Sequence, residues 1–163
     1  MLSSAHSLQN VRIDTPERVR RMLQARSIAF VGGASVTPAL NYLRDLGFSG
    51  DLAVVNAKRP GVAGIPAVRE VDDLPFVPDV AFVAINRQAA ADVIRRLVKN
   101  GAGAIVCNSA GFAEAGPEGA RLQQQVVSAA DGAVLIGPNS RRPKSRRQGF
   151  LNDRCGIEPR LTG

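Results

Sequence analysis

The stretch SIAFVGGAS, residues 27–35, sets the pattern that the rest of the chain repeats. An apolar run, residues 27–31, passes directly into the small residues Gly32, Gly33, Ala34 and Ser35. Glycines let the backbone turn sharply off a strand, and amides at the start of a following helix are suited to facing a phosphate. The stretch therefore predicts a strand, a tight turn and a helix, in that order.

Four further apolar runs end in the same way, on a small or polar cluster. They are residues 52–55, 80–85, 104–106 and 133–136. The clusters that follow them begin at Asn56, Asn86, Asn108 and Gly137. If helices separate the runs, the strands are parallel and every cluster lies on the carboxyl edge of one sheet, where open α/β folds bind ligands.

The segments between the runs carry helix signals. Two of them begin with a hydroxyl residue followed by proline, at Thr15-Pro16 and Thr37-Pro38. Apolar residues at helical spacing, with Gly47 and Gly101 as stops, complete the pattern. We expect helices over residues 16–24, 37–46, 87–100 and 117–130, a short strand over 65–68 and a helical turn over 71–74.

This alternation predicts a three-layer α/β fold, a Rossmann-like doubly wound parallel sheet in a single domain. A length of 163 residues and a hydrophobic content of 45% suit one core, so a single domain is expected. We place it over residues 15–140, where strand and helix signals alternate. Residues 1–14 are predicted to be a flexible N-terminus. Residues 141–163, dense in Arg, Pro and Gly, are predicted to be a basic, disordered tail.

The net charge of +7 is concentrated at one end of the chain. Residues 141–163 hold seven Lys and Arg against two Asp and Glu, which leaves a charge of only +2 for residues 1–140. We therefore do not expect the fold to bind nucleic acid. No apolar run approaches the ~20 residues needed to cross a membrane, so a cytoplasmic protein without membrane contact is expected.

Catalytic and metal-binding patterns are weak. His6 is the single histidine, and Cys107 lies within a predicted strand as a core residue. Asp72, Asp73 and Asp79 have no His or Cys at ligand spacing, so we interpret them as solvated or helix-capping side chains. No metal site and no catalytic residue is predicted.

The end of the second run distinguishes between nucleotide ligands. NAD-binding sheets usually place an acidic residue there, which accepts hydrogen bonds from the ribose diol. This chain has Asn56 instead, followed by Lys58 and Arg59. Two cations and no carboxylate favour a phosphorylated ribose, as in NADP or coenzyme A. The six-residue GxGxxG pattern of dinucleotide-binding loops is absent, which weakens the case for NADP.

Four motifs in their order along the chain resemble one known family. They are VGGAS from Val31, VVNAK from Val54, SAGFAEAG from Ser109 and GPN from Gly137. Together they resemble the coenzyme A-binding domain of ADP-forming acyl-CoA synthetases and of the succinyl-CoA synthetase α subunit. The resemblance covers roughly residues 25–139 and implies coenzyme A as the ligand, with an NADP-binding redox or sensor domain as the alternative.

The resemblance also implies which residues surround the ligand. Residues 33–36 would approach the nucleotide or pyrophosphate, Lys58 a phosphate, residues 85–87 the adenine or ribose, and residues 109–111 the pantetheine arm. The predicted site comprises Gly32, Gly33, Ala34, Ser35, Val36, Asn56, Lys58, Arg59, Ile85, Asn86, Arg87, Ser109, Ala110, Gly111, Phe112, Pro138 and Asn139.

The chain departs from the family at its carboxyl end. After Gly137-Pro138-Asn139 it continues from Ser140 into a basic segment, where the family usually has an apolar stretch. The family's phosphorylated histidine and ATP-grasp parts have no counterpart here. We therefore expect a binding domain that is not catalytically complete alone, and two partners stay open: a second copy of the chain and a separate synthetase subunit.

Overall fold

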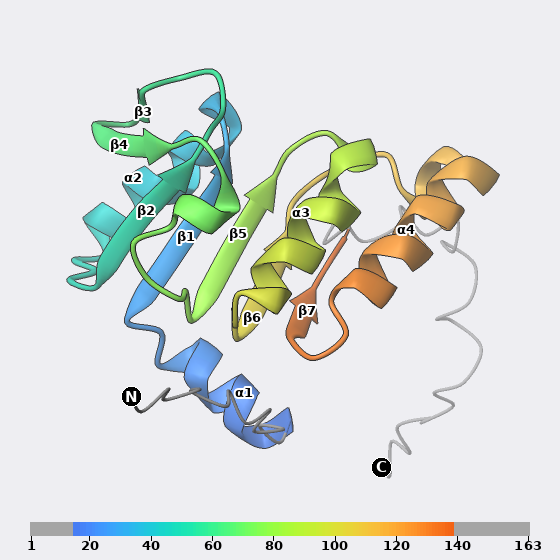
Figure 1. Ribbon diagram of the computed structural model, residues 1–163, viewed down its shortest axis with the longest axis horizontal. Coiled ribbons are helices and arrows are strands. Elements are labelled where there is room, and N and C mark those ends of the chain that lie inside the picture. The colour runs from blue at the N-terminus through green and yellow to red at the C-terminus, as the bar shows by residue number, and fades with distance from the viewer. Residues whose placement is uncertain (1–14, 139–163) are drawn as a thin grey trace, which may run out of the picture.

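A seven-stranded sheet forms the middle layer of the molecule (Figure 1). The structure is a computed structural model that describes residues 15–138; the predicted N-terminal segment 1–14 and basic tail 141–163 lie outside the described residues. The strand order is β3-β4-β2-β1-β5-β6-β7. The strands are β1 (Ser27–Gly32), β2 (Asp51–Val55), β3 (Gly61–Val62), β4 (Ile65–Val68), β5 (Val80–Ala84), β6 (Ala104–Cys107) and β7 (Val134–Ile136).

The five apolar runs are parallel strands, as the sequence predicts. β1 pairs with β2 on one side and with β5 on the other, and β6 and β7 continue the parallel sheet. The predicted strand at residues 65–68 is β4, which pairs in parallel with β2. Strand β3 was not predicted. It is two residues long and antiparallel to β4, so its signal is a tight turn rather than an apolar run.

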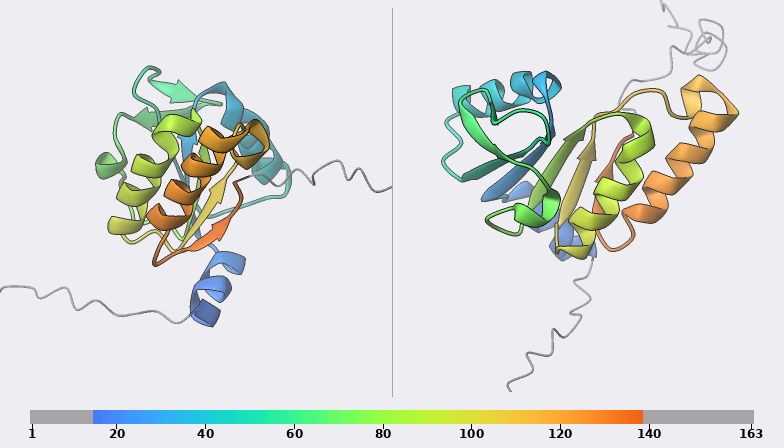
Figure 2. Two further views of the ribbon diagram at one scale, coloured as in Figure 1. Left: turned by 90° about the vertical axis from the view of Figure 1, so that its right-hand side faces the viewer. Right: turned by 45° about the horizontal axis from the view of Figure 1, so that its top comes forward.

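Helices cover both faces of this sheet. They are α1 (Thr15–Leu23), α2 (Thr37–Asp45), α3 (Arg87–Lys99) and α4 (Pro117–Ala129), with short 3₁₀ turns η1 (Ala34–Val36), η2 (Val71–Asp73) and η3 (Ala113–Ala115). Figure 2 shows α3 and α4 side by side on one face, with α2 on the other. The fold is therefore the predicted three-layer, Rossmann-like α/β domain.

Two apolar clusters hold the layers together, one on each face. Ile94 and Leu97 of α3 and Val126 of α4 pack on Val83 and Ile105 of the sheet. On the other face the core includes Leu40 of α2 and the ring of Phe30, whose centroid lies 5.6 Å from that of Phe82. Side chains that alternate along one strand thus feed two separate cores, which is the requirement of a sheet buried on both faces.

No helix within residues 15–138 is long and apolar enough to cross a membrane.

Candidate functional site

The carboxyl ends of the parallel strands bring the predicted clusters to one edge of the sheet (Figure 1). The loops after β1, β2, β5, β6 and β7 all begin there. We call the loop at residues 32–36 the glycine turn and the loop at residues 56–59 the cation turn. Asn139, the last predicted site residue, lies outside the described residues.

The glycine turn is packed closely against the end of β5. A Cβ atom added to Gly32 would lie 2.8 Å from the carbonyl oxygen of Ala84 and 2.8 Å from a methyl group of Val36, so only glycine fits. The Ser35 hydroxyl donates a hydrogen bond to the same Ala84 carbonyl over 2.8 Å. Helix α2 begins at Thr37, but its N-cap is Val36 without a side-chain cap, because the turn η1 precedes it.

Asn56 links the cation turn to the glycine turn. Its amide nitrogen donates to the carbonyl oxygen of Gly32 over 2.8 Å. Its amide oxygen accepts hydrogen bonds from the backbone amides of Lys58 and Arg59, at 2.9 and 3.0 Å. The Lys58 and Arg59 side chains are exposed at the edge.

The loops after β5 and β6 are also joined by side chains. The Ser109 hydroxyl, which is buried, accepts a hydrogen bond from the backbone amide of Ile85 over 3.3 Å. The half-buried Arg87 guanidinium donates to the carbonyl of Gly111. Asn86 caps α3 by accepting a bond from the amide of Gln88 over 3.0 Å. The adenine-side and pantetheine-side loops of the predicted site are therefore cross-linked.

The predicted site residues differ in what they expose. Exposed at the edge are Ala34, Ser35, Lys58, Arg59, Asn86 and Ala110. Half-buried are Gly33, Asn56, Ile85, Arg87 and Gly111. Buried are Gly32, Val36, Ser109, Phe112 and Pro138. The side chains of Val36 and Phe112 are fully buried in the two cores, so these residues border the edge by their backbone.

Beneath this edge the structure offers little nucleophilic chemistry. Cys107 ends β6 and is buried, and this burial raises the pKa of its thiol above the usual value. A thiol that resists ionisation is a poor nucleophile at neutral pH. Cys107 is therefore a core residue, as the sequence predicts.

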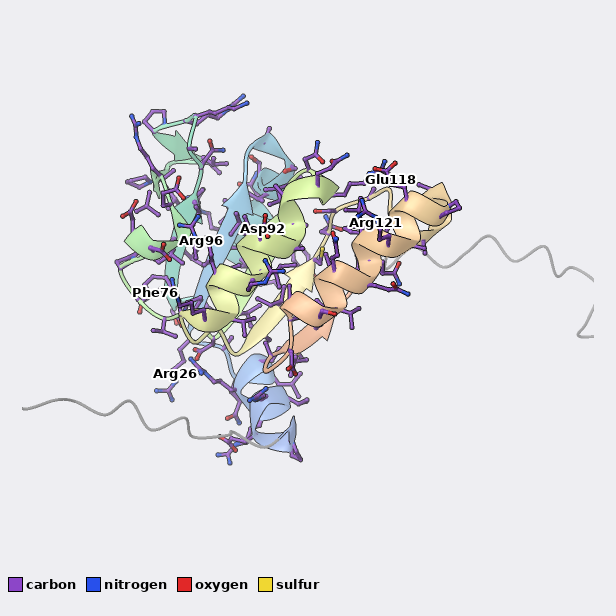
Figure 3. The ribbon with its side chains drawn as sticks, turned by 45° about the vertical axis from the view of Figure 1, so that its right-hand side comes forward. Arg26, Phe76, Asp92, Arg96, Glu118 and Arg121 are labelled. Carbon is purple, nitrogen blue, oxygen red and sulfur yellow. The ribbon has the colours of Figure 1, made fainter. Side chains whose placement is uncertain are left out.

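An open depression lies at the opposite, amino edge of the sheet. It has a volume of about 620 Å³, and its lining includes Phe76 and Arg96, both labelled in Figure 3. The Arg96 guanidinium already donates to Glu70 and Asp72, each at 2.8 Å. Hydrogen bonds from Asn100 and Arg96 in turn lower the pKa of Asp72. Because this cation is already shared by two carboxylates, the hollow suits an anionic ligand less well than the carboxyl edge.

Comparisons with known proteins match this chain to one group. The family described as "CoA binding domain" matches residues 26–140. A trans-feruloyl-CoA synthase from an unknown prokaryotic organism is 39% identical over 130 residues, covering 76% of this chain and 18% of that protein. An ADP-forming acetate–CoA ligase from Archaeoglobus fulgidus is 33% identical over 94 residues, covering 56% of this chain and 14% of the relative.

A solved structure agrees with these relatives. The dinucleotide-forming acetyl-coenzyme A synthetase 1 of Ca. Korarchaeum cryptofilum, in complex with phosphate and ADP, superposes with a TM-score of 0.61 at 30% identity. The match covers 70% of this chain and 26% of the synthetase. The chain thus spans less than a fifth of the two curated relatives and about a quarter of the solved one.

Proposed function

The chain belongs to the CoA-binding domain family, and from this premise we propose that it binds coenzyme A along the carboxyl edge of its sheet. The observation that carries the proposal is the meeting of the glycine turn and the cation turn there. Asn56 stands where an NAD site would have a carboxylate, and the neighbouring Lys58 and Arg59 are exposed. The cross-linked loops after β5 and β6 supply the rest of the surface.

Each part of the edge has a proposed role toward one part of the ligand. Lys58 supplies charge to the 3′-phosphate, and the glycine turn approaches the nucleotide or pyrophosphate. Residues 85–87 border the adenine or ribose, and residues 109–111 shape the path of the pantetheine arm. A hydrogen bond from a charged ammonium group to a phosphate is roughly twice as strong as one between neutral groups, and the exposed Lys58 side chain is free of the sheet to make one.

Calorimetric titration tests the proposal directly. We expect heat of binding with coenzyme A, a weaker affinity for dephospho-coenzyme A, and no binding of NADH. If well-folded protein gives no heat with either form of coenzyme A, the proposal is wrong. Tight binding of NADPH that coenzyme A does not compete with would instead favour the alternative, a redox or sensor domain that holds a 2′-phosphate with Lys58 and Arg59.

The role of Lys58 has its own test. We expect Lys58→Ala to weaken the binding of coenzyme A by roughly ten- to hundredfold, since a charge-assisted hydrogen bond contributes about 1.5–3 kcal/mol, and to leave the binding of dephospho-coenzyme A little changed. The matched control is Lys99→Ala, which removes an exposed lysine at the amino edge. Equal losses for the two ligands would show that Lys58 does not contact the 3′-phosphate.

We further propose that thioester synthesis requires parts of a synthetase beyond this chain. The single histidine, His6, precedes the matched region of residues 26–140. The purified chain is expected to bind coenzyme A without forming a thioester from ATP and acetate or ferulate. A separate subunit would be the partner that supplies those further parts, and product formation by the chain alone would contradict this proposal.

A further inference from the structure

Asn56 uses both ends of its side-chain amide at the carboxyl edge. One end donates to the carbonyl of Gly32, and the other accepts from the amides of Lys58 and Arg59. All three distances lie between 2.8 and 3.0 Å, which is the range of well-formed hydrogen bonds. A half-buried side chain therefore connects the backbones of two strand-end loops that are 24 residues apart.

The pattern of donors and acceptors requires an amide at position 56. The Gly32 carbonyl needs a donor, and the two backbone amides need an acceptor, so the orientation of the carboxamide is fixed by its partners. A carboxylate would still accept from Lys58 and Arg59, but its other oxygen would face the Gly32 carbonyl across 2.8 Å with no proton between them. Asparagine meets both demands, whereas aspartate meets one.

The Gly32 end of this link is itself held by the sheet. The backbone at Gly32 is packed so closely that an added Cβ atom would collide with Ala84 and Val36. The Ser35 hydroxyl, bonded to the Ala84 carbonyl, fixes the far side of the same turn. Asn56 thus ties the cation turn to the end of β5 through the glycine turn, rather than leaving it as a free loop.

We propose that Asn56 is a positioning residue that holds the Lys58 backbone in register with the glycine turn and so sets the site's preference for a ribose that carries a phosphate. The inference rests on the proposed coenzyme A function. A turn that is held before the ligand arrives loses less conformational freedom on binding. This raises the affinity for the ligand that contacts the cation turn, which is coenzyme A rather than dephospho-coenzyme A.

Two variants and one control separate positioning from general stability. Asn56→Ala removes all three hydrogen bonds, and Asn56→Asp keeps the acceptor while losing the bond to Gly32. The control, Asn100→Ala, removes a side-chain amide that donates to Asp72 at the amino edge. Two readouts apply to each protein: amide hydrogen exchange at Lys58 and Arg59 by NMR without ligand, and calorimetric affinity for coenzyme A and dephospho-coenzyme A.

We expect Asn56→Ala to speed exchange at Lys58 and Arg59 by about fivefold or more, the factor that corresponds to one hydrogen bond of about 1 kcal/mol. Its coenzyme A affinity should fall by a similar factor while dephospho-coenzyme A changes little. Asn56→Asp should keep the amides protected and yet lose more coenzyme A affinity, because its charge repels the phosphate. Asn100→Ala should change neither readout.

Specific results would overturn the inference. Unchanged exchange in Asn56→Ala would show that Asn56 does not hold the cation turn. Equal losses for both ligands, in protein that remains folded, would assign Asn56 a structural role alone. If the unaltered chain binds no coenzyme A, the proposed function is wrong and the preference for phosphate with it. The exchange rates alone then decide whether Asn56 holds the turn.

Discussion

Asp79 is the residue through which α1 and the sheet are joined. Its carboxylate accepts from the Arg21 guanidinium at 2.5 Å, from the backbone amide of Arg26 at 2.9 Å and from the Ser27 hydroxyl at 3.2 Å. Burial alone would raise the pKa of Asp79, but these hydrogen bonds outweigh it and the pKa lies below the usual 3.8. The ionised form is therefore the one that stabilises the fold.

The sign of this shift gives a pH prediction. A carboxyl group whose pKa is lower in the folded state stabilises above its unfolded pKa of 3.8, and the stabilisation is lost as the pH falls through its folded pKa. At pH 7 we expect Asp79→Asn to lower the free energy of unfolding by about 2 kcal/mol, as for a hydrogen-bonded charge. Urea denaturation at pH 7 and at pH 3 should show the difference shrinking in acid.

The control for Asp79 is an exposed carboxylate elsewhere. Asp131→Asn, at the turn after α4, should change the free energy of unfolding by no more than about 0.5 kcal/mol at either pH. A deficit of Asp79→Asn that stays constant between pH 7 and pH 3 would contradict the ionic role of Asp79.

For a single residue, the sequence shows which hydrogen-bonding groups the side chain carries but not which distant residues it bonds to. Asn56 stands out as the residue that replaces an acid, and its tendency to bond amides two residues ahead is a local property. Its bond to Gly32 depends on which strands are neighbours and has no local signal. Asp79 was interpreted as solvated or helix-capping for the same reason, because Arg21 and Ser27 lie more than 50 residues before it.

Among the elements, α4 owes its position to one glycine. A Cβ atom added to Gly119 would lie 1.8 Å from the carbonyl oxygen of Phe112 and 2.9 Å from that of Gly111. The helix therefore rests directly on the backbone of the loop after β6. The sequence predicts the helix from its period, but it gives no sign that residue 119 is a contact point.

Gly119→Ala tests this contact. Within an exposed helix alanine is about 1 kcal/mol more favourable than glycine, but here the collision with backbone must be relieved by moving the loop. We expect a net destabilisation of about 2 kcal/mol in urea denaturation. Coenzyme A binding should also weaken, since Gly111 belongs to the predicted site. Gln125→Ala, exposed on the same helix, should leave both unchanged.

The helices with a clear local period were predicted closely, whereas the short elements β3 and η1 were not. Helix α3, expected over residues 87–100, spans Arg87–Lys99, and the helix expected over 117–130 spans Pro117–Ala129. In contrast, η1 before α2 was missed. Ser35 within η1 donates a hydrogen bond to the carbonyl of Ala84 at the end of β5, a contact that arises only when β1 and β5 are paired.

Across the whole molecule, the two faces of the sheet are covered unequally. Under α3 and α4, Val83, Ile105 and Cys107 are at most 3% exposed. On the other face of the same strands, Phe82 and Val106 are half-buried, and Ile136 of β7 is 41% exposed. The parallel direction of the main strands follows from the alternation of strands and helices, so the sequence predicts it. The greater exposure of this face among residues 15–138 depends on where α1 and α2 end, which the sequence does not show.

The different exposure of the two faces predicts that replacing Ile105 and replacing Ile136 will have different costs in stability. Ile105→Ala empties a closed core and should cost about 2–5 kcal/mol, whereas Ile136→Ala removes a side chain already in contact with solvent and should cost less than about 1 kcal/mol. Urea denaturation of both variants measures the difference. A large cost for Ile136→Ala would mean that the face is covered in solution. A large loss of stability that grows with protein concentration would show that a second copy of the chain covers Ile136. A large loss that does not depend on concentration would show that residues outside 15–138 cover it.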